Sequence, residues 1–122
     1  MSKRAQDATI EARIENEAIV DAHDSEEQAM GWYYYLEDKL HTPFTAECFL
    51  MRKTSPLNPG EVVTVKGMAD VDECEKEMFV TIEWQGRELA VPLMQLKVLE
   101  AAADIVEGVG DWHYWVERGY RF

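Results

Sequence analysis

The apolar residues of the chain change their spacing near residue 44, and this change limits the possible fold more than any other feature. Before it, Ile10, Ile14 and Ala18 recur at every fourth position, which is the spacing of a helix. After it, apolar and polar residues alternate, as in "MFVTIEW", which is typical of a strand with one buried face. The sequence therefore predicts helices followed by strands in an α+β fold.

Two helices are expected before this change of spacing. The first covers about residues 9–22. The second follows Asp24, a residue type that caps helices, and covers about 25–41. It ends before Pro43, because the residue that precedes a proline avoids the helical region. The helical part of the chain is thus predicted over about 9–41.

The remainder of the chain predicts a small sheet and a last helix. Residues 44–99 contain several short strands with tight connections, and a helical turn is expected after Pro92. This pattern favours a small SH3-like antiparallel β-barrel, with the N-terminal helices packed on it. Residues 101–119 are predicted to form a short C-terminal helix. The length of 122 residues predicts a single domain, 1–122.

The net charge of −12, from 24 acidic and 12 basic side chains, opposes nucleic-acid binding because a phosphate backbone would be repelled. Cations or basic proteins are the expected partners. The N-terminal sequence lacks the apolar run of a secretory signal, and no stretch reaches the roughly 20 apolar residues of a membrane-spanning helix. We therefore expect a cytoplasmic protein without a membrane partner. The histidines are scattered and there is no glycine-rich phosphate loop, so we do not expect an enzyme.

The two cysteines lie in separate segments, at Cys48 and Cys74. Their spacing matches no common zinc motif, and reduced, partly buried thiols are the simplest interpretation. A disulfide between them stays open.

The sequence "GWYYYLEDKL" places aromatic and acidic residues side by side on the second predicted helix. On a helical wheel one side carries the apolar residues Ala29, Trp32, Tyr33, Leu36 and Leu40. Asp38 points almost directly away from that side, and Tyr34 and Tyr35 flank it. We therefore expect Trp32 and Tyr33 in the core, and a partly enclosed Asp38 if a second element covers it.

Acidic residues are concentrated in two stretches. Residues 9–27 hold seven acids and one base, and residues 70–77, "DVDECEKE", hold five acids and one lysine. Neighbouring carboxylates at ~6 Å repel one another by about 3 kcal/mol at an effective dielectric constant of ~20. One interpretation is that both stretches are solvated faces. The other is that folding gathers acids from distant segments into a divalent-cation site.

Calcium is the cation that fits this second interpretation best. It accepts six to eight oxygen ligands in irregular geometry, whereas magnesium requires stricter octahedral placement. An EF-hand is excluded by counting from Asp70, because the fifth and sixth positions are Cys74 and Glu75. Counting from Asp21 fails as well, since the third position is His23.

Four segments together resemble the CcbP-type calcium-binding proteins known from cyanobacteria. They are "IENEAIVDAHDSEEQAMGWYYYLEDKLHTPFTAEC", "DECEKEMFVTIEW", "LAVPLMQL" and "DWHYWVERGY". The resemblance covers roughly residues 10–120. It implies a calcium-binding protein without EF-hands, whose ions are held mainly by acidic side chains.

The resemblance implies metal ligands in two places. The acidic end of the second helix falls on Glu37 and Asp38, and the acidic loop between strands falls on Asp72, Glu73 and Glu75. Asp38 is the strongest candidate because its helix holds it rigidly, and Glu75 could complete its ligand shell.

Glu17 and Asp21, one turn apart on the first predicted helix, form a second candidate pair. The predicted function is calcium buffering or sensing. The alternative is an acidic SH3-like interaction module that binds a basic partner protein.

Overall fold

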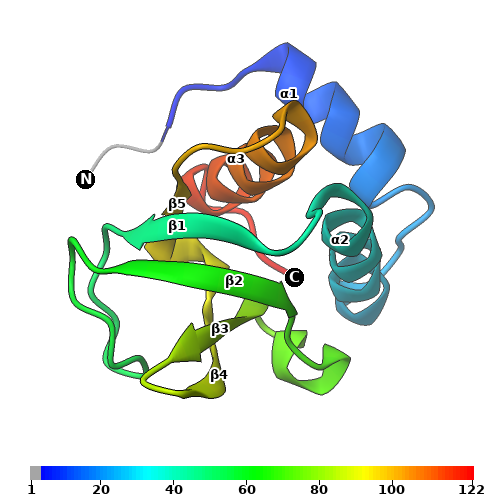
Figure 1. The fold of residues 1–122 in the computed structure, drawn as a ribbon. Coiled ribbons are helices and arrows are strands. Elements are labelled where there is room, and N and C mark those ends of the chain that lie inside the picture. The colour runs from blue at the N-terminus through cyan, green and yellow to red at the C-terminus, as the bar shows by residue number, and fades with distance from the viewer. Residues whose placement is uncertain (1–3) are drawn as a thin grey trace.

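The computed structural model describes residues 4–122, and its elements follow the predicted order (Figure 1). The helices are α1 (Ala8–Arg13), α2 (Ser25–Lys39) and α3 (Ala103–Glu117), and the π-helical turn η1 (Ile14–Ala18) continues α1. The strands are β1 (Phe44–Cys48), β2 (Val62–Met68), β3 (Phe79–Trp84), β4 (Arg87–Pro92) and β5 (Leu96–Val98). The 3₁₀ turn η2 (Val71–Cys74) joins β2 to β3, and η3 (Leu93–Gln95) joins β4 to β5.

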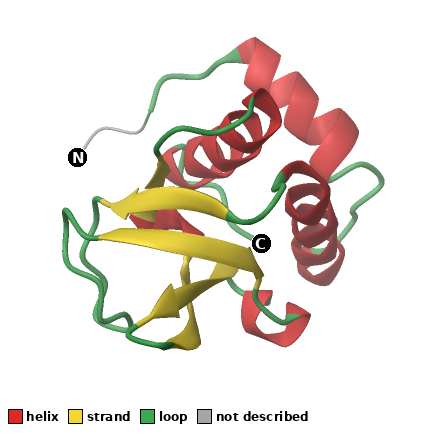
Figure 2. Cartoon of the chain, in the orientation of Figure 1, coloured by secondary structure: helices red, strands yellow, loops and turns green. Residues whose placement is uncertain are grey.

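The strands form one antiparallel sheet in the order β4-β3-β2-β1-β5. Among the described residues β4 and β5 are therefore opposite edges, and the sheet is not closed. The predicted SH3-like barrel is not confirmed. Strand β5 has only three residues, and α3 contacts β5 and η3. A helix thus covers the end of the sheet at which a barrel would need further strand pairing (Figure 2).

The hairpin of β3 and β4 agrees with the alternation in the sequence. Met78, Val80 and Ile82 are completely buried, while Glu83 of β3 is exposed. The turn at Gln85 and Gly86 has positive φ angles of 49° and 83°, which suit a tight two-residue hairpin.

Helix α2 packs against neighbours on two sides, and the tyrosine that it buries differs from the predicted one. Tyr35 is buried and faces α3, where its hydroxyl donates to Asp111 at 2.7 Å. Tyr33 is half-buried on the opposite side and donates to the carbonyl of Ala69 at 2.8 Å. Ala29, Trp32, Leu36 and Leu40 of the predicted apolar side are buried as expected. Tyr33 is only partly buried, and Tyr35 is buried in addition, because the helix lies between α3 and the end of β2. Tyr34 alone of the three stays 57% exposed.

Aromatic side chains fill the space between α2 and α3. Trp32, which is completely buried, packs edge-on against Trp112 with ring centroids 5.1 Å apart. The ring centroid of Trp115 lies 5.6 Å from that of Trp32. Such contacts add to the free energy gained by burying large side chains. They fix one long face of α2 and leave the sector with Asp38 toward solvent.

The ends of the helices differ from the prediction in three places. Helix α2 begins after Asp24, whose side chain accepts from Glu27 N at 2.8 Å, and it ends at Lys39, two residues before the predicted boundary. The C-terminal helix is not short, since α3 has 15 residues, as α2 does. The first helix stops at Ala18, and not at residue 22. No helix of the described residues is long and apolar enough to cross a membrane.

The turn η1 approaches α2 so closely that only glycine fits at position 31. A Cβ atom on Gly31 would lie 2.3 Å from the backbone oxygen of Ala18. Because that oxygen belongs to the backbone, it cannot rotate away as a side chain can. Gly31 therefore sets the distance between η1 and α2.

We expect Gly31→Ala to lower the free energy of unfolding by about 1–3 kcal/mol, because the new methyl group forces the two helices apart. Gly110→Ala is the matched control in α3, where a Cβ would meet no described atom within 4 Å apart from the neighbouring residues and backbone of its own helix. Since alanine favours helices over glycine, this control is expected to gain about 0.5–1 kcal/mol. Urea unfolding measures both, and a Gly31→Ala protein as stable as the wild type would contradict the close approach.

Candidate metal centre

Asp38 lies in a cleft between α2 and η1, with a volume of about 430 Å³. We call it the Asp38 cleft; its lining residues include Glu17, Ala18, Val20, Tyr34, Tyr35, Asp38 and Lys39. Glu17 and Asp38 are far apart in the sequence, and the contact of Ala18 with Gly31 brings their segments together. The turn η1 is thus the element beside Asp38, but it does not cover Asp38, and the expected partial enclosure is wrong. Both flanking tyrosines line the cleft as the wheel indicated, although Asp38 itself remains exposed.

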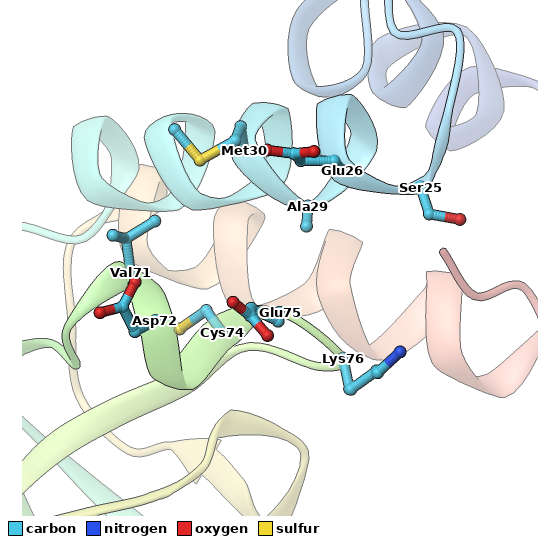
Figure 3. Close-up of a pocket in the computed structure, with 9 residues that line it drawn as sticks. All are labelled: Ser25, Glu26, Ala29, Met30, Val71, Asp72, Cys74, Glu75 and Lys76. Carbon is cyan, nitrogen blue, oxygen red and sulfur yellow. The ribbon is translucent and has the colours of Figure 1, made fainter.

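Asp72 and Glu75 line a second cleft, of about 440 Å³, on the other side of α2. We call it the Glu75 cleft. One wall consists of η2 and the residues after it, and the opposite wall of the first half of α2, with Glu26 and Met30 (Figure 3). The acidic loop therefore packs beside the beginning of α2 and not beside Asp38.

The remaining candidates lie apart from these two clefts. Glu73 faces a groove on the sheet side of η2, together with Asp70 and Glu88. Glu37 is exposed near Tyr33, where burial first, and then the charges of Glu37 and Asp70, raise the pKa of the phenol.

Asp21 is not one helical turn from Glu17, as predicted, because η1 ends at Ala18 and Asp21 has a φ angle of 57° in the following turn. It lines a separate groove with Glu26 and Glu27.

The acids are gathered less tightly than the sequence suggested. Among residues 4–122, no three or more acidic, cysteine or histidine side chains lie close enough to hold a metal ion. The clefts offer carboxylates from separate segments, and no ion pair of the described residues involves Glu17, Asp38, Asp72 or Glu75. Their oxygens remain free to accept a cation and water molecules. Calcium tolerates such a mixed shell of carboxylate and water oxygens.

Cys74 belongs to the wall of the Glu75 cleft, but its sulfur is turned into the protein. The thiol is 1% exposed, and its Sγ accepts from the Phe79 amide at 3.3 Å. Burial raises the pKa of this thiol and also that of Cys48, which keeps both protonated. Both cysteines are free and buried, as the simplest interpretation of the sequence predicted.

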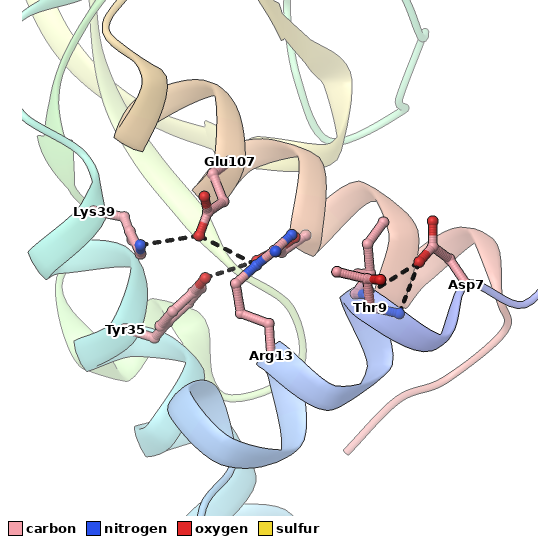
Figure 4. A network of polar contacts seen from close by, with 8 residues as sticks. Asp7, Thr9, Arg13, Tyr35, Lys39 and Glu107 are labelled. Carbon is pink, nitrogen blue, oxygen red and sulfur yellow. Dashed lines mark hydrogen bonds and ion pairs between the residues drawn. The ribbon is translucent and has the colours of Figure 1, made fainter.

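A network of charged residues joins the three helices next to the Asp38 cleft (Figure 4). Asp111 of α3 is 1% exposed and accepts from Arg13 Nε at 2.8 Å and Arg13 Nη2 at 2.6 Å. The Tyr35 hydroxyl donates to the same carboxylate. This bond raises the pKa of Tyr35, after burial, which has the larger effect, and the bond to Asp111 raises the pKa of Arg13. No pattern in the sequence around Asp111 distinguishes it from the other acidic residues.

Glu107, one turn before Asp111, extends the network to the cleft. Its Oε1 lies 3.2 Å from Arg13 Nε and 3.1 Å from Lys39 Nζ. The hydrogen bond to Glu107 raises the pKa of Lys39, and Asp104 and Glu17 add to it at longer range. Lys39 is thus a cation on the wall of the cleft that is bound on the α3 side.

Comparison with known proteins gives three findings. A family model described as "Calcium binding", Calci_bind_CcbP, matches residues 12–116. The crystal structure of Anabaena CcbP is 41% identical over 100% of both chains, with a TM-score of 0.88. A solved structure described as a calcium-binding protein in the calcium-binding form is 40% identical over 100% of both chains, with a TM-score of 0.86. No curated protein matches the chain.

We expect Arg13→Ala to lower the free energy of unfolding by about 3–5 kcal/mol, because it leaves the buried Asp111 carboxylate without its cation. Arg4→Ala is the control, since it removes an exposed pair with Glu117 and should cost less than about 1 kcal/mol. Chemical unfolding followed by tryptophan fluorescence measures the difference. Equal effects of the two substitutions would refute a structural role for the network.

Proposed function

The chain belongs to the CcbP family of calcium-binding proteins, with Ca²⁺ as the ligand, and from this premise we propose that it buffers calcium through the carboxylates beside α2. The observation that carries the proposal is the Asp38 cleft, which Glu17 and Asp38, from distant segments, line together. We assign the primary site to these two residues. The Glu75 cleft, with Glu26, Asp72 and Glu75, is assigned as a second site.

The charge and the exposure of these clefts favour a hard divalent cation. Each cleft presents at least two carboxylates, and the protein carries a net charge of −12 that raises the local cation concentration. Since the clefts are open, a bound ion keeps part of its water shell. Calcium accepts oxygens in irregular positions, whereas magnesium requires near-octahedral placement, and carboxylates from separate segments therefore favour calcium.

Glu37, Glu73 and Asp21 have a different role in this proposal. They lie outside both clefts, so they contribute through the long-range field and do not contact the ion. Their individual replacement should change calcium affinity less than replacement of Asp38.

Buffering is favoured over sensing because the core face of α2 has little freedom to move. Trp32 and Leu36 are completely buried, and Gly31 contacts the backbone of η1. A sensor requires two arrangements between which the ligand chooses. An ion on the solvent side of a helix fixed in this way orders side chains without rotating the helix.

We expect Asp38→Asn to weaken calcium binding about tenfold, because one of two carboxylates facing the ion is neutralised. Glu83→Gln removes the same charge from an exposed position on β3 and should leave the affinity nearly unchanged. Isothermal titration calorimetry at low ionic strength measures both. No calcium-dependent heat in the wild type, together with an unchanged melting temperature, would refute calcium binding itself.

We also expect terbium, a luminescent substitute for calcium, to identify the cleft. Tyr34 lines the Asp38 cleft and is exposed, so a terbium ion held there should receive energy from its ring. Tyr34→Phe should dim the sensitised emission while the binding heat persists. Asp72→Asn combined with Glu75→Gln should spare this emission but reduce the number of ions bound.

Titration with a basic protein, in calcium and in chelator, distinguishes the calcium buffer from the acidic interaction module. A basic protein that binds in the presence of a chelator, and dissociates as salt is added, would favour the module. No binding of a basic protein under either condition would favour the buffer, whereas binding that requires calcium would favour a sensor.

A further inference from the structure

The Asp38 cleft contains a cation of its own. Lys39 lines the cleft together with Glu17 and Asp38. An ammonium group in reach of two carboxylates competes with a calcium ion for the same oxygens, and it does so at a high effective concentration because it is part of the chain. The calcium affinity of the cleft therefore depends on where the ammonium is held.

The structure holds Lys39 on the α3 side by three contacts. Its Nζ lies 3.1 Å from Glu107 Oε1 and 5.6 Å from the centre of the Tyr35 ring. Its stem lies over Gly108, where an added Cβ would come within 2.8 Å of Lys39 Cβ. Figure 4 shows Lys39 extending from α2 to Glu107, across the gap between the helices.

Glu107 is itself fixed from the other side. The same Oε1 lies 3.2 Å from Arg13 Nε, and Arg13 is bound by the buried Asp111. The carboxylate is thus shared between two cations, and it cannot turn toward the cleft without losing both. Asp111, Arg13, Glu107 and Lys39 form a continuous chain of contacts from the core to the cleft.

We propose that Glu107 is a positioning residue that maintains the calcium affinity of the Asp38 cleft by holding Lys39 away from Glu17 and Asp38. The inference rests on the calcium function proposed above. Without Glu107, the long flexible side chain of Lys39 turns to the remaining carboxylates, neutralises one of them and repels the ion.

The ion pair of Lys39 with Glu107 contributes little to the stability of the fold, and its main effect is on the position of Lys39. The side chain of Glu107 is 35% exposed, and pairs of this kind stabilise a fold only slightly. Loss of Glu107 should therefore change the calcium affinity while the melting temperature stays close to that of the wild type. These two readouts distinguish a positioning role from a structural one.

The test compares Glu107→Gln, Lys39→Met and the double variant by calcium calorimetry. We expect Glu107→Gln to weaken binding about three- to tenfold, from one unit charge facing a divalent ion at ~6 Å in a water-like dielectric. In the double variant the affinity should return to that of Lys39→Met alone. Glu117→Gln is the matched control, because it removes the same charge and an ion pair from the same helix, with Arg4 in place of Lys39.

Two outcomes would overturn the inference. One is a loss of affinity from Glu107→Gln that is equally large in the Lys39→Met background. The other is a Glu107→Gln protein that binds calcium as the wild type does. If Asp38→Asn still weakens binding in either case, only the role of Glu107 fails. If neither Asp38→Asn nor Glu107→Gln has an effect, the assignment of the cleft fails with it.

Discussion

The buried carboxylate of Asp111 is the interaction on which the arrangement of the helices depends. It accepts from Arg13 at the end of α1 and from Tyr35 of α2, while it belongs to α3 itself. A charge at 1% exposure is tolerated only with such complete pairing. Because three helices must meet for the pairing to form, η1 is placed beside α2. The Asp38 cleft is the outer side of that contact.

The acids around α2 then remain at the surface for an electrostatic reason. Carboxylates that face one another repel, and at the surface, where water surrounds them, the repulsion is small. This explains why segments with matching acids lie side by side although no three acids of the described chain converge. Ordering these side chains around an ion costs conformational entropy, and this cost reduces the free energy of binding. A site of this kind therefore binds less tightly than a preformed one. Weaker binding of this kind agrees with the calcium-buffer role proposed above.

The sequence predicted local features better than contacts between distant elements. The capping of α2 by Asp24, the buried face of β3 and the turn at Gln85 follow from rules that involve neighbouring residues only. The burial of Tyr35 in place of Tyr33 was not predicted, because the helical wheel assumes one buried side, whereas α2 has two neighbours. The predicted barrel is not confirmed for a related reason, since strand alternation determines which face is buried and not which edges meet.

The candidate site divides in the same way. The wheel placed Asp38 away from the core, between two tyrosines, and the structure has this arrangement. Glu17 was predicted to pair with Asp21, but Asp21 lies beyond the end of η1, and Glu17 lines the same cleft as Asp38 instead. Nothing in the sequence around Asp111 or Glu107 marks them as partners of Arg13 and Lys39, because those pairings exist only after α3 has packed on α2.

The distribution of the few basic residues connects the fold to the site. Arg4, Arg13 and Lys39, all from the N-terminal part, pair with Glu117, Asp111 and Glu107 of α3. These ion pairs connect the N-terminal part to α3, and the pair of Arg13 with the buried Asp111 contributes most to stability. The acids of the clefts stay unpaired as a result, although they outnumber the bases. In the calcium function proposed above, these carboxylates, where α2 meets η1 and η2, are the ones that accept a cation from solution.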